Sequence, residues 1–498
     1  MRKLLSFVLL VGSALPISAQ RILSLDSCRA LALRNNKQLN ISKLKQDVAH
    51  NTRLAVKTKY LPKVDAAGSY IFTSREFSLL NDDQKNTLSN LGTNLAAGLG
   101  GNANAVMTDL VQKGVITMQQ ASALGELLSN TTTSVATALN NVGNQIKDAF
   151  RTDTRNIFTA TLAVRQPIYM GGAITAANKM AEISEKLAYN NIDAQTQGTI
   201  HSIDQAYWLV VSLKQKDALA SQYLQLTEKF SDDVKKMIRE GVCTKADGLR
   251  VDVRVNEAEM AKTQVEDGLV LAKMYLCQLC GIPMDEEITL EDEGKASLGA
   301  TITTSTFDKE LAMSNRPELK MLQNTIDLSK QNIKLIRAEY MPQIAALGGY
   351  TLSNPNVLNG FQRKFGGLFH VGVMVRVPIW TWHEGRYKVN AAKAATNMAE
   401  MELTEAREKI DLQVSQSAFK VKEANKRLVM STKNLEQAEE NLRCANLGFS
   451  EGVMQITEVV AAQTAWQQAH TQKIDAEIEL KLCQVDLQKA LGTLGTDY

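Results

Sequence analysis

Two patterns of hydrophobic and polar residues run along the chain, and they predict two kinds of element. Residues 168–282 and 379–498 contain no proline, and their apolar residues recur at mixed spacings of three and four. This spacing is typical of long helices that bury one face. Four shorter segments instead alternate with a period of two, which indicates β-strands. We expect these strands at about 63–73, 157–167, 343–353 and 368–378.

Each predicted strand has one apolar face and one small or polar face, most clearly in the last segment. Each is about ten residues long, the length of a tilted membrane strand, and aromatic residues cluster at the strand ends as in interfacial girdles. Four strands cannot close a barrel, because about eight is the smallest number, so identical chains are expected to share one. A dimer or a trimer would satisfy this requirement. The residues of the last strand expected to face lipid are Phe369, Val371, Val373 and Val375.

The sequence is internally duplicated. Tyr60 and Pro62 recur as Tyr340 and Pro342, an offset of 280 residues, whereas "FTATLAVRQPIY" from Phe158 recurs 211 residues later as "FHVGVMVRVPIW". The difference, 280 − 211, places 69 extra residues in the first copy. Such long copies indicate a duplicated subdomain rather than a solenoid.

The duplication and the proline positions predict the organisation of the chain. A signal peptide (1–19) is followed by a first repeat (20–281), an inter-repeat linker (282–310) and a second repeat (311–498). Each repeat is expected to begin with a helix, 26–58 or 311–339, that leads into the first of its two strands. A helical hairpin follows the second strand, at about 171–280 and 385–490. An insertion at about 74–156 separates the first two strands and is expected to form a lid, a plug or a surface ornament.

Composition narrows the function classes. Arg2, Lys3, an apolar run and a small-residue exit at Ala19 predict a secretory signal, so the mature chain is exported. Removing those two charges lowers the net charge from +3 to +1, and the remaining charges are interspersed, which argues against a nucleic-acid partner. No later segment approaches the roughly 18 uninterrupted apolar residues of a membrane helix.

The sequence contains no catalytic motif. Its five histidines form no HExxH pattern, and "GLGG" lacks the Lys-Ser/Thr of a phosphate loop. Cys277 and Cys280 form a CxxC late in a helical pattern, and we expect them to be packing thiols rather than a redox or metal site. We therefore expect no enzymatic activity, no cofactor and no metal.

These segments together resemble the TolC-like outer-membrane efflux proteins over essentially the whole mature chain. The resemblance rests on "SLDSCRALALRNNKQL", the strand entries "YLPKV" and "YMPQI", the strand exits "RQPIYMGG" and "RVPIWTWHEG", and a glycine-led turn in each hairpin. It implies a homotrimer with a 12-stranded barrel in the outer membrane of a Gram-negative bacterium and a helical tunnel in the periplasm. The linker would form part of an equatorial region around the tunnel.

The resemblance also implies a function. The trimer would be a passive exit duct for drugs, toxic compounds or other substrates, and its partners would be outer-membrane lipid, a periplasmic adaptor protein and an inner-membrane transporter. Two alternatives stay open: the outer-membrane duct of a type I protein secretion system, and a periplasmic coiled-coil scaffold without a pore.

The family's hairpin-tip pattern, G-x-x-x-x-x-D-x-L-x-A, occurs twice in altered form, with Glu458 replacing the aspartate in the second copy. By similarity, three Glu458 carboxylates would surround the axis at the periplasmic entrance, where converging like charges attract cations. The alternative is a solvated acid on a helix turn. The other tip residues, expected to contact the adaptor, are Gly241, Asp247, Leu249, Gly452, Val460 and Ala462.

Two further residue sets follow from the repeat. Arg165 and Arg376 are equivalent and would form a basic pair at the periplasmic mouth of the barrel, or else snorkel to the interface or pair between strands. The junctions between strands and helices are marked by Pro62, Pro167, Gly171, Gly172, Pro342, Pro378 and Gly385.

Overall fold

The computed structural model describes residues 21–98, 103–127, 133–152, 154–295 and 309–495, so the predicted signal peptide lies outside the described residues. The chain divides into two units. The helical unit comprises Met1–Val56, Thr175–Ile336 and Glu384–Tyr498, and the sheet unit comprises Lys57–Ile174 and Arg337–His383. The predicted fold class, four antiparallel strands and long helical hairpins in a duplicated chain, is confirmed.

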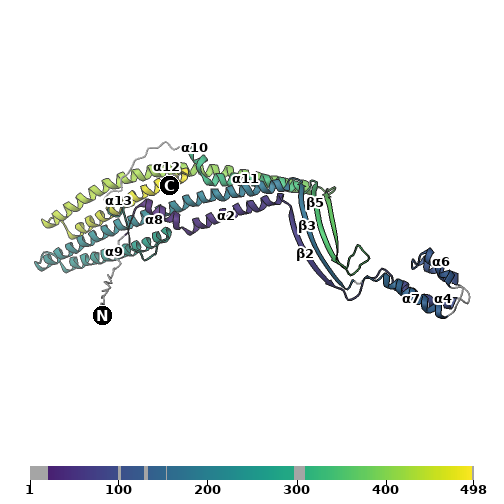
Figure 1. Cartoon of the computed structure of the whole chain (residues 1–498). Coiled ribbons are helices and arrows are strands. Elements are labelled where there is room, and N and C mark those ends of the chain that lie inside the picture. The colour runs from purple at the N-terminus through teal and green to yellow at the C-terminus, as the bar shows by residue number, and fades with distance from the viewer. Residues whose placement is uncertain (1–20, 99–102, 128–132, 153, 296–308, 496–498) are drawn as a thin grey trace, which may run out of the picture. The chain divides into compact units, whose positions relative to one another are not determined.

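The helical unit is built on two hairpins of equal dimensions (Figure 1). Their first helices each contain 67 residues, about 100 Å at 1.5 Å per residue, and their second helices each contain 36. Both hairpins turn at a glycine with positive φ, +77° at Gly241 and +73° at Gly452. The helices are α8 (Ala173–Arg239), α9 (Lys245–Cys280), α12 (Glu384–Ser450) and α13 (Ile456–Leu491).

Each of the two shorter predicted helices is broken once, which the periodicity did not show. The breaks lie at Asn36 and Arg316, which are 280 residues apart. The Asn36 side chain accepts hydrogen bonds from the backbone N–H groups of Gln38 and Leu39 (2.9 and 3.0 Å) and so caps a new helix. Pro317 starts the other new helix, at the position where proline needs no donor. The resulting helices are α1 (Leu25–Asn35), α2 (Lys37–Lys57), α10 (Lys309–Asn315) and α11 (Pro317–Ala338).

A buried ion pair lies in the main core of the helical unit. The Asp204 carboxylate, inaccessible to solvent, accepts hydrogen bonds from Arg29 Nε (2.7 Å) and Nη2 (2.6 Å). Burial raises the pKa of Asp204, although the Arg29 guanidinium opposes that shift.

A short two-stranded parallel sheet, β1 (Arg21–Leu23) and β4 (Ile288–Leu290), joins the start of the described chain to the inter-repeat linker.

The sheet unit contains one four-stranded antiparallel sheet in the order β2-β3-β5-β6. Its strands are β2 (Lys63–Phe72), preceded by the 3-10 turn η1 (Thr58–Tyr60), and β3 (Asn156–Met170), β5 (Gln343–Asn354) and β6 (Gly366–Arg376). Strands β2 and β6 form the two edges, so each lacks a partner on one side among the residues that the structure describes. None of the helices in the described ranges combines the length and apolar character needed to span a membrane.

The described residues of the insertion form five helices around a hydrophobic core of their own. Gly92 of α4 allows α4 and α7 to approach closely, and Gly143 of α7 does the same for α7 and α3: a Cβ at Gly92 would lie 2.0 Å from the backbone oxygen of Ala136. The Asn140 side chain of α7 accepts a 2.7 Å hydrogen bond from Gly92 N at the start of α4. The insertion is therefore a packed helical domain rather than an extended loop. Its helices are α3 (Asp82–Ser89), α4 (Leu91–Gly98), α5 (Ala103–Gln112), α6 (Met118–Leu127) and α7 (Thr133–Ala149).

Candidate functional site

The strand register places the predicted apolar positions of all four strands on one face of the sheet. In one row Ala66 pairs with Leu162, Leu162 with Tyr350, and Tyr350 with Phe369. The next row contains Val64, Val164, Gly348 and Val371, and the rows beyond it carry Val373 and Val375. The valine side of β6 is exposed, with Val371 at 71%. The sheet thus presents a continuous apolar face.

Two rows bound this face, and we call them the aromatic rows because the first contains two aromatic residues and the second contains one. Tyr70 and Phe158 pair at one end, with ring centroids 4.7 Å apart, and Tyr169 lies at the other end beside Ile344. Along β5 the two rows are ten residues apart, from Asn354 to Ile344, which is about 34 Å of strand. At the usual barrel tilt of about 40°, this corresponds to a height of about 25 Å, the height of the apolar band of outer-membrane barrels.

The opposite face carries both predicted arginines but does not bring them together. Arg165 pairs with Lys63 on one side and with Leu347 on the other. Arg376 pairs with Gln343, four residues away from Leu347 along β5. The basic neighbour of Arg165 is therefore Lys63, a residue that sequence comparison of the two repeats did not identify.

Most predicted junction residues lie at strand ends. Pro62 and Pro342 directly precede β2 and β5, Pro378 follows β6, and Pro167 sits in β3 at a register shift between Pro167 and Tyr169. At such positions proline removes no required ladder hydrogen bond.

The two repeats make the turn from strand to helix with different residues. Gly171 and Gly172 have φ values of +64° and +89°, and their equivalents 211 residues later, Trp382 and His383, have +51° and +63°. Gly385, predicted for this role, lies instead within the first turn of α12. The two non-glycine residues adopt a conformation that usually favours glycine. Their rings both contact Trp380, with centroids 5.6 and 5.9 Å from it.

The two tip acids make the same local contact, because each closes a capping box at the start of the returning helix. Asp247 Oδ2 accepts hydrogen bonds from the Thr244 backbone N (3.2 Å) and Oγ1 (2.6 Å). Glu458 Oε2 accepts one from the Gln455 backbone N (3.1 Å). The hydrogen bond from the Thr244 side chain lowers the pKa of Asp247. Both acids therefore stabilise a helix N-terminus, whatever else they do.

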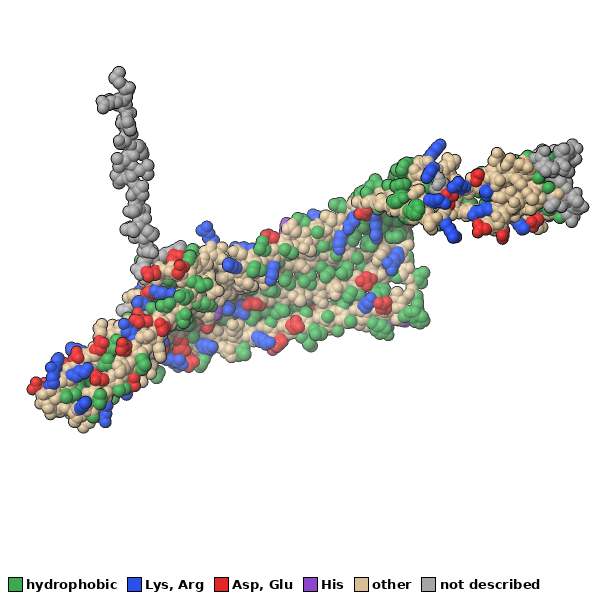
Figure 2. Space-filling view, turned by 90° about the horizontal axis from the view of Figure 1, so that it is seen from below, with side chains coloured by type: hydrophobic (Ala, Val, Ile, Leu, Met, Phe, Trp, Pro, Cys, Tyr) green, Lys and Arg blue, Asp and Glu red, His purple; other side chains and the backbone are tan. Residues whose placement is uncertain are grey.

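Sequence analysis missed the capping residues Thr244 and Gln455 themselves. They lie 211 residues apart, so the repeat offset combined with the capping-box spacing could have found them. Glu458 is exposed, and its side chain is turned toward its own helix start. The helix ends around these turns carry charged side chains of both signs, at the left of Figure 2.

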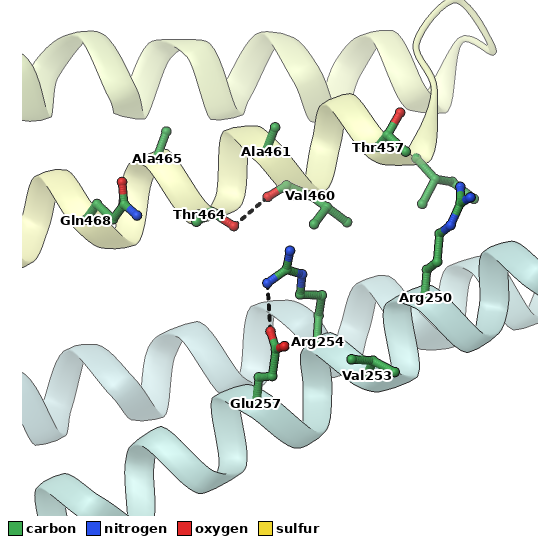
Figure 3. Close-up of a pocket in the computed structure, with 11 residues that line it drawn as sticks. Arg250, Val253, Arg254, Glu257, Thr457, Val460, Ala461, Thr464, Ala465 and Gln468 are labelled. Carbon is green, nitrogen blue, oxygen red and sulfur yellow. Dashed lines mark hydrogen bonds and ion pairs between the residues drawn. The ribbon is translucent and has the colours of Figure 1, made fainter.

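A groove of about 600 Å³ runs between α9 and α13 next to the tip. Arg250 and Arg254 extend from α9 toward the small side chains of α13, and Arg254 Nη1 lies 2.7 Å from Glu257 Oε2 (Figure 3). Among the predicted tip residues, Val460 lines this groove, Leu249 is exposed and Ala462 is buried. The groove combines a basic wall with an apolar, small-residue wall.

The described residues contain no cluster of three or more His, Cys, Asp or Glu side chains that could hold a metal ion. Cys277 and Cys280 are wholly buried in the main core, together with Cys28 of α1. Burial raises the pKa of the Cys277 thiol. Thiols in such surroundings are unreactive packing groups.

Comparison with known sequences identifies a family. The family model described as "Outer membrane efflux protein" matches residues 127–281 and 310–493. Over 272 residues the chain is 22% identical to the alkaline protease secretion protein AprF of Pseudomonas aeruginosa, covering 52% of this chain and 55% of AprF. Over 344 residues it is 20% identical to the outer membrane protein TolC of Vibrio cholerae, covering 68% of this chain and 77% of TolC. The chain thus spans about half the length of AprF and three quarters of TolC.

Solved structures share the fold. The outer membrane protein VceC of Vibrio cholerae superposes with a TM-score of 0.68 over 94% of this chain and 96% of VceC, at 14% sequence identity. The similarity therefore extends across both the helical hairpins and the sheet.

Proposed function

The chain belongs to the outer membrane efflux protein family, and on that premise we propose that it is the outer-membrane channel of a tripartite efflux system. Three copies would form a passive exit duct in the outer membrane of a Gram-negative bacterium, with the helical unit in the periplasm. Its substrates would be drugs, toxic compounds or other molecules handed on by an inner-membrane pump and a periplasmic adaptor. The family and the fold are those of channel proteins rather than enzymes.

The observation that carries this proposal is a sheet with one continuous apolar face and two open edges. A strand edge cannot stay unpaired in lipid, because its N–H and C=O groups would have no partner there. Since this sheet contains four antiparallel strands in the described residues, β2 and β6 run in opposite directions. Pairing β6 of one copy with β2 of the next therefore continues the antiparallel order around a barrel.

Three copies give twelve strands, the number implied by the resemblance to TolC-like proteins. A periplasmic scaffold without a pore is disfavoured, because it would have no use for an apolar face about 25 Å tall bounded by aromatic rows. In such a scaffold the exposed valines of β6 would lower the solubility of the protein and would have no function.

The helical hairpins would form the periplasmic tunnel, and their tips would be the entrance. Two features of the hairpin tips favour them as the adaptor-binding surface. These are the groove between α9 and α13 and the capped turns. At the entrance, the Glu458 carboxylate would lie next to the axis while it caps α13. Three such charges would attract cations.

Protein export is a second candidate, favoured by one observation. AprF, a secretion protein by name, matches over a 272-residue segment. An outer-membrane duct of a type I secretion system would require the same barrel and tunnel, and it would differ in the inner-membrane partner and the substrate.

The test is purification of the full-length protein from outer membranes, followed by planar-bilayer recording. We expect a heat-sensitive trimer on gels, a stable conductance and a copurifying periplasmic adaptor. A water-soluble monomer that never enters bilayers would refute the channel. The copurifying inner-membrane transporter, and whether a drug or a polypeptide accumulates in cells that lack the protein, would decide between efflux and secretion.

A further inference from the structure

Helices α8 and α12 occupy equivalent places in the two repeats, but their apolar residues differ in exposure. Trp208 of α8 is 7% exposed, whereas its equivalent 211 residues later, Phe419 of α12, is 67% exposed. Leu219 and Met430 differ in the same way, at 6% and 71%. Because the two hairpins have equal dimensions, the cover over α8 comes from outside its own hairpin. Among the described residues, the equivalent face of α12 is open.

Helix α13 of the second repeat covers α8. His201 Nε2 of α8 lies 2.7 Å from Asp486 Oδ1 of α13, and Lys481 Nζ of α13 lies 5.8 Å from the centre of the Trp208 ring. The four long helices follow one another in the order α12, α13, α8 and α9 (Figure 1), and each contacts the next. The two outer helices of this row are therefore α12 and α9.

The repeat relation predicts what covers α12. Moved by 211 residues, the contact of α8 with α13 becomes a contact of α12 with α9. Within one chain these two helices lie on opposite sides of the row, but the α9 residues at the equivalent positions are exposed and apolar or aromatic. They are Val270, Leu271 and Tyr275, which correspond to Lys481, Leu482 and Asp486 of α13. One chain thus carries both halves of this contact on its two outer helices.

We propose that α9 of a second copy of this chain covers α12. Leu412 of α12, the equivalent of His201, contacts Tyr275 of the next copy, and Phe419 contacts Val270 of the next copy. The contact joins two different surfaces, so it is head-to-tail and closes into a ring when the rotation between copies allows it. This inference rests on the proposed function, which supplies the assembly of identical copies. Helices and strands would both join the second repeat of one copy to the first repeat of the next.

The spacing of the open residues on α12 favours a helix as the occupant. Leu412, Phe419 and Met430 are 7 and 11 residues apart (419 − 412 and 430 − 419), so they follow one face of α12. All three are large, exposed and apolar, and covering them removes apolar surface from water. Helix α9 presents a matching apolar face, whereas an unrelated protein would need to supply its own. A second copy is therefore the occupant that the chain itself provides.

The contact between copies differs in chemistry from the contact within the chain. The position that holds the His201–Asp486 pair within the chain holds Leu412 and Tyr275 between copies. An ion pair of histidine and aspartate depends on the protonation of the histidine, whereas a contact of leucine with tyrosine does not. The contact between copies is therefore independent of histidine protonation at this position.

The test is site-directed cross-linking of the full-length protein in outer membranes. The background C243S/C444S removes the two cysteines that are not buried. In this background L412C/Y275C, treated with a short bifunctional maleimide, should give covalently linked dimers and trimers on denaturing gels. Each single variant, L412C or Y275C, should stay monomeric on the same gels, because the second thiol is missing from the contact.

Two neighbouring exposed residues of α12 give a matched control for exposure. Val429 is the equivalent of Ala218, which is exposed in the first repeat, whereas Met430 is the equivalent of the buried Leu219. In the purified trimer M430C should lose its reaction with a charged maleimide, and V429C should keep it. Both should react after heat dissociates the trimer.

Three results would contradict the inference. An intact trimer without the L412C/Y275C cross-link, or one in which M430C reacts as readily as V429C, would overturn this contact and leave the channel standing. Protection of M430C only in the presence of the periplasmic adaptor would also overturn it, because the adaptor would then be the occupant. If the parent protein gives no trimer before the cross-linker is added, the proposed function fails and the contact between copies fails with it.

Discussion

An arginine scan along β6 tests the lipid-facing assignment with a gradient rather than a single value. The row midway between the two aromatic rows falls between Phe369 and Val371, and Val375 shares its row with Tyr169. Two residues of a strand tilted by about 40° change the depth by about 5 Å. Val371 is therefore within a few Å of the bilayer midplane, and Val375 is at the interface.

The expected destabilisation follows this depth. V371R should cost about 2 to 4 kcal/mol, V375R about 0 to 1 kcal/mol, and V373R an intermediate amount. The control is M374R, which places the same side chain on the opposite face of the same strand. It should be tolerated if that face lines water.

The assay is the urea dependence of trimer assembly into lipid vesicles, compared between variants at equal protein concentration. Equal destabilisation by V371R, V373R and V375R would refute the depth argument. A strand that is buried in protein or exposed to water would show no decrease from Val371 to Val375. Greater damage from M374R than from V371R would refute the assignment of the two faces.

Four other changes test separate parts of the structure. G92A should destabilise the insertion by about 1 to 3 kcal/mol, because the new Cβ meets the backbone of α7 at 2.0 Å; hydrogen exchange should rise in the insertion alone. D204N removes the charge of the buried carboxylate and one of its two acceptor oxygens for Arg29, which keeps Asp26 at 3.4 Å, so it should destabilise the helical unit by about 1 to 3 kcal/mol in chemical unfolding. E458Q keeps a capping oxygen but loses the charge, so it should weaken cation preference in single-channel recordings without loss of trimer; unchanged selectivity would remove the entrance role. His201 lowers the pKa of Asp486, a stabilisation that is present above the unfolded pKa and lost as the pH falls through the folded one; H201Q should therefore unfold at a higher pH in an acid titration.

The sheet was predictable because its signal is local and repeated. Pleating forces a period of two, so the apolar faces could be assigned strand by strand. The register then had little freedom, since a shift by one residue would turn a whole strand over. Hence the row from Ala66 to Phe369 contains only apolar or aromatic residues, as the period of two requires.

At the hairpin tips, the sequence predicted the two acids but not the contacts that they make. The family pattern marked Asp247 and Glu458 as functional, and the structure adds that both close capping boxes. Their hydrogen bonds depend on a residue three positions earlier, and Gln455 is an unusual capping residue that composition does not flag. The breaks at Asn36 and Arg316 were missed for a related reason, because the apolar period continues across them.

Helix lengths explain where the extra residues of the first repeat could be accommodated. Both long helices contain 67 residues and both returning helices 36, so the two hairpins are rods of equal length. An insertion in either rod would change its length, and one within a strand would shift the register. The connection between β2 and β3 affects neither, because it joins the ends of two strands and lies outside both hairpins. A helical domain with its own core can grow there while the apolar face and both rods keep their dimensions.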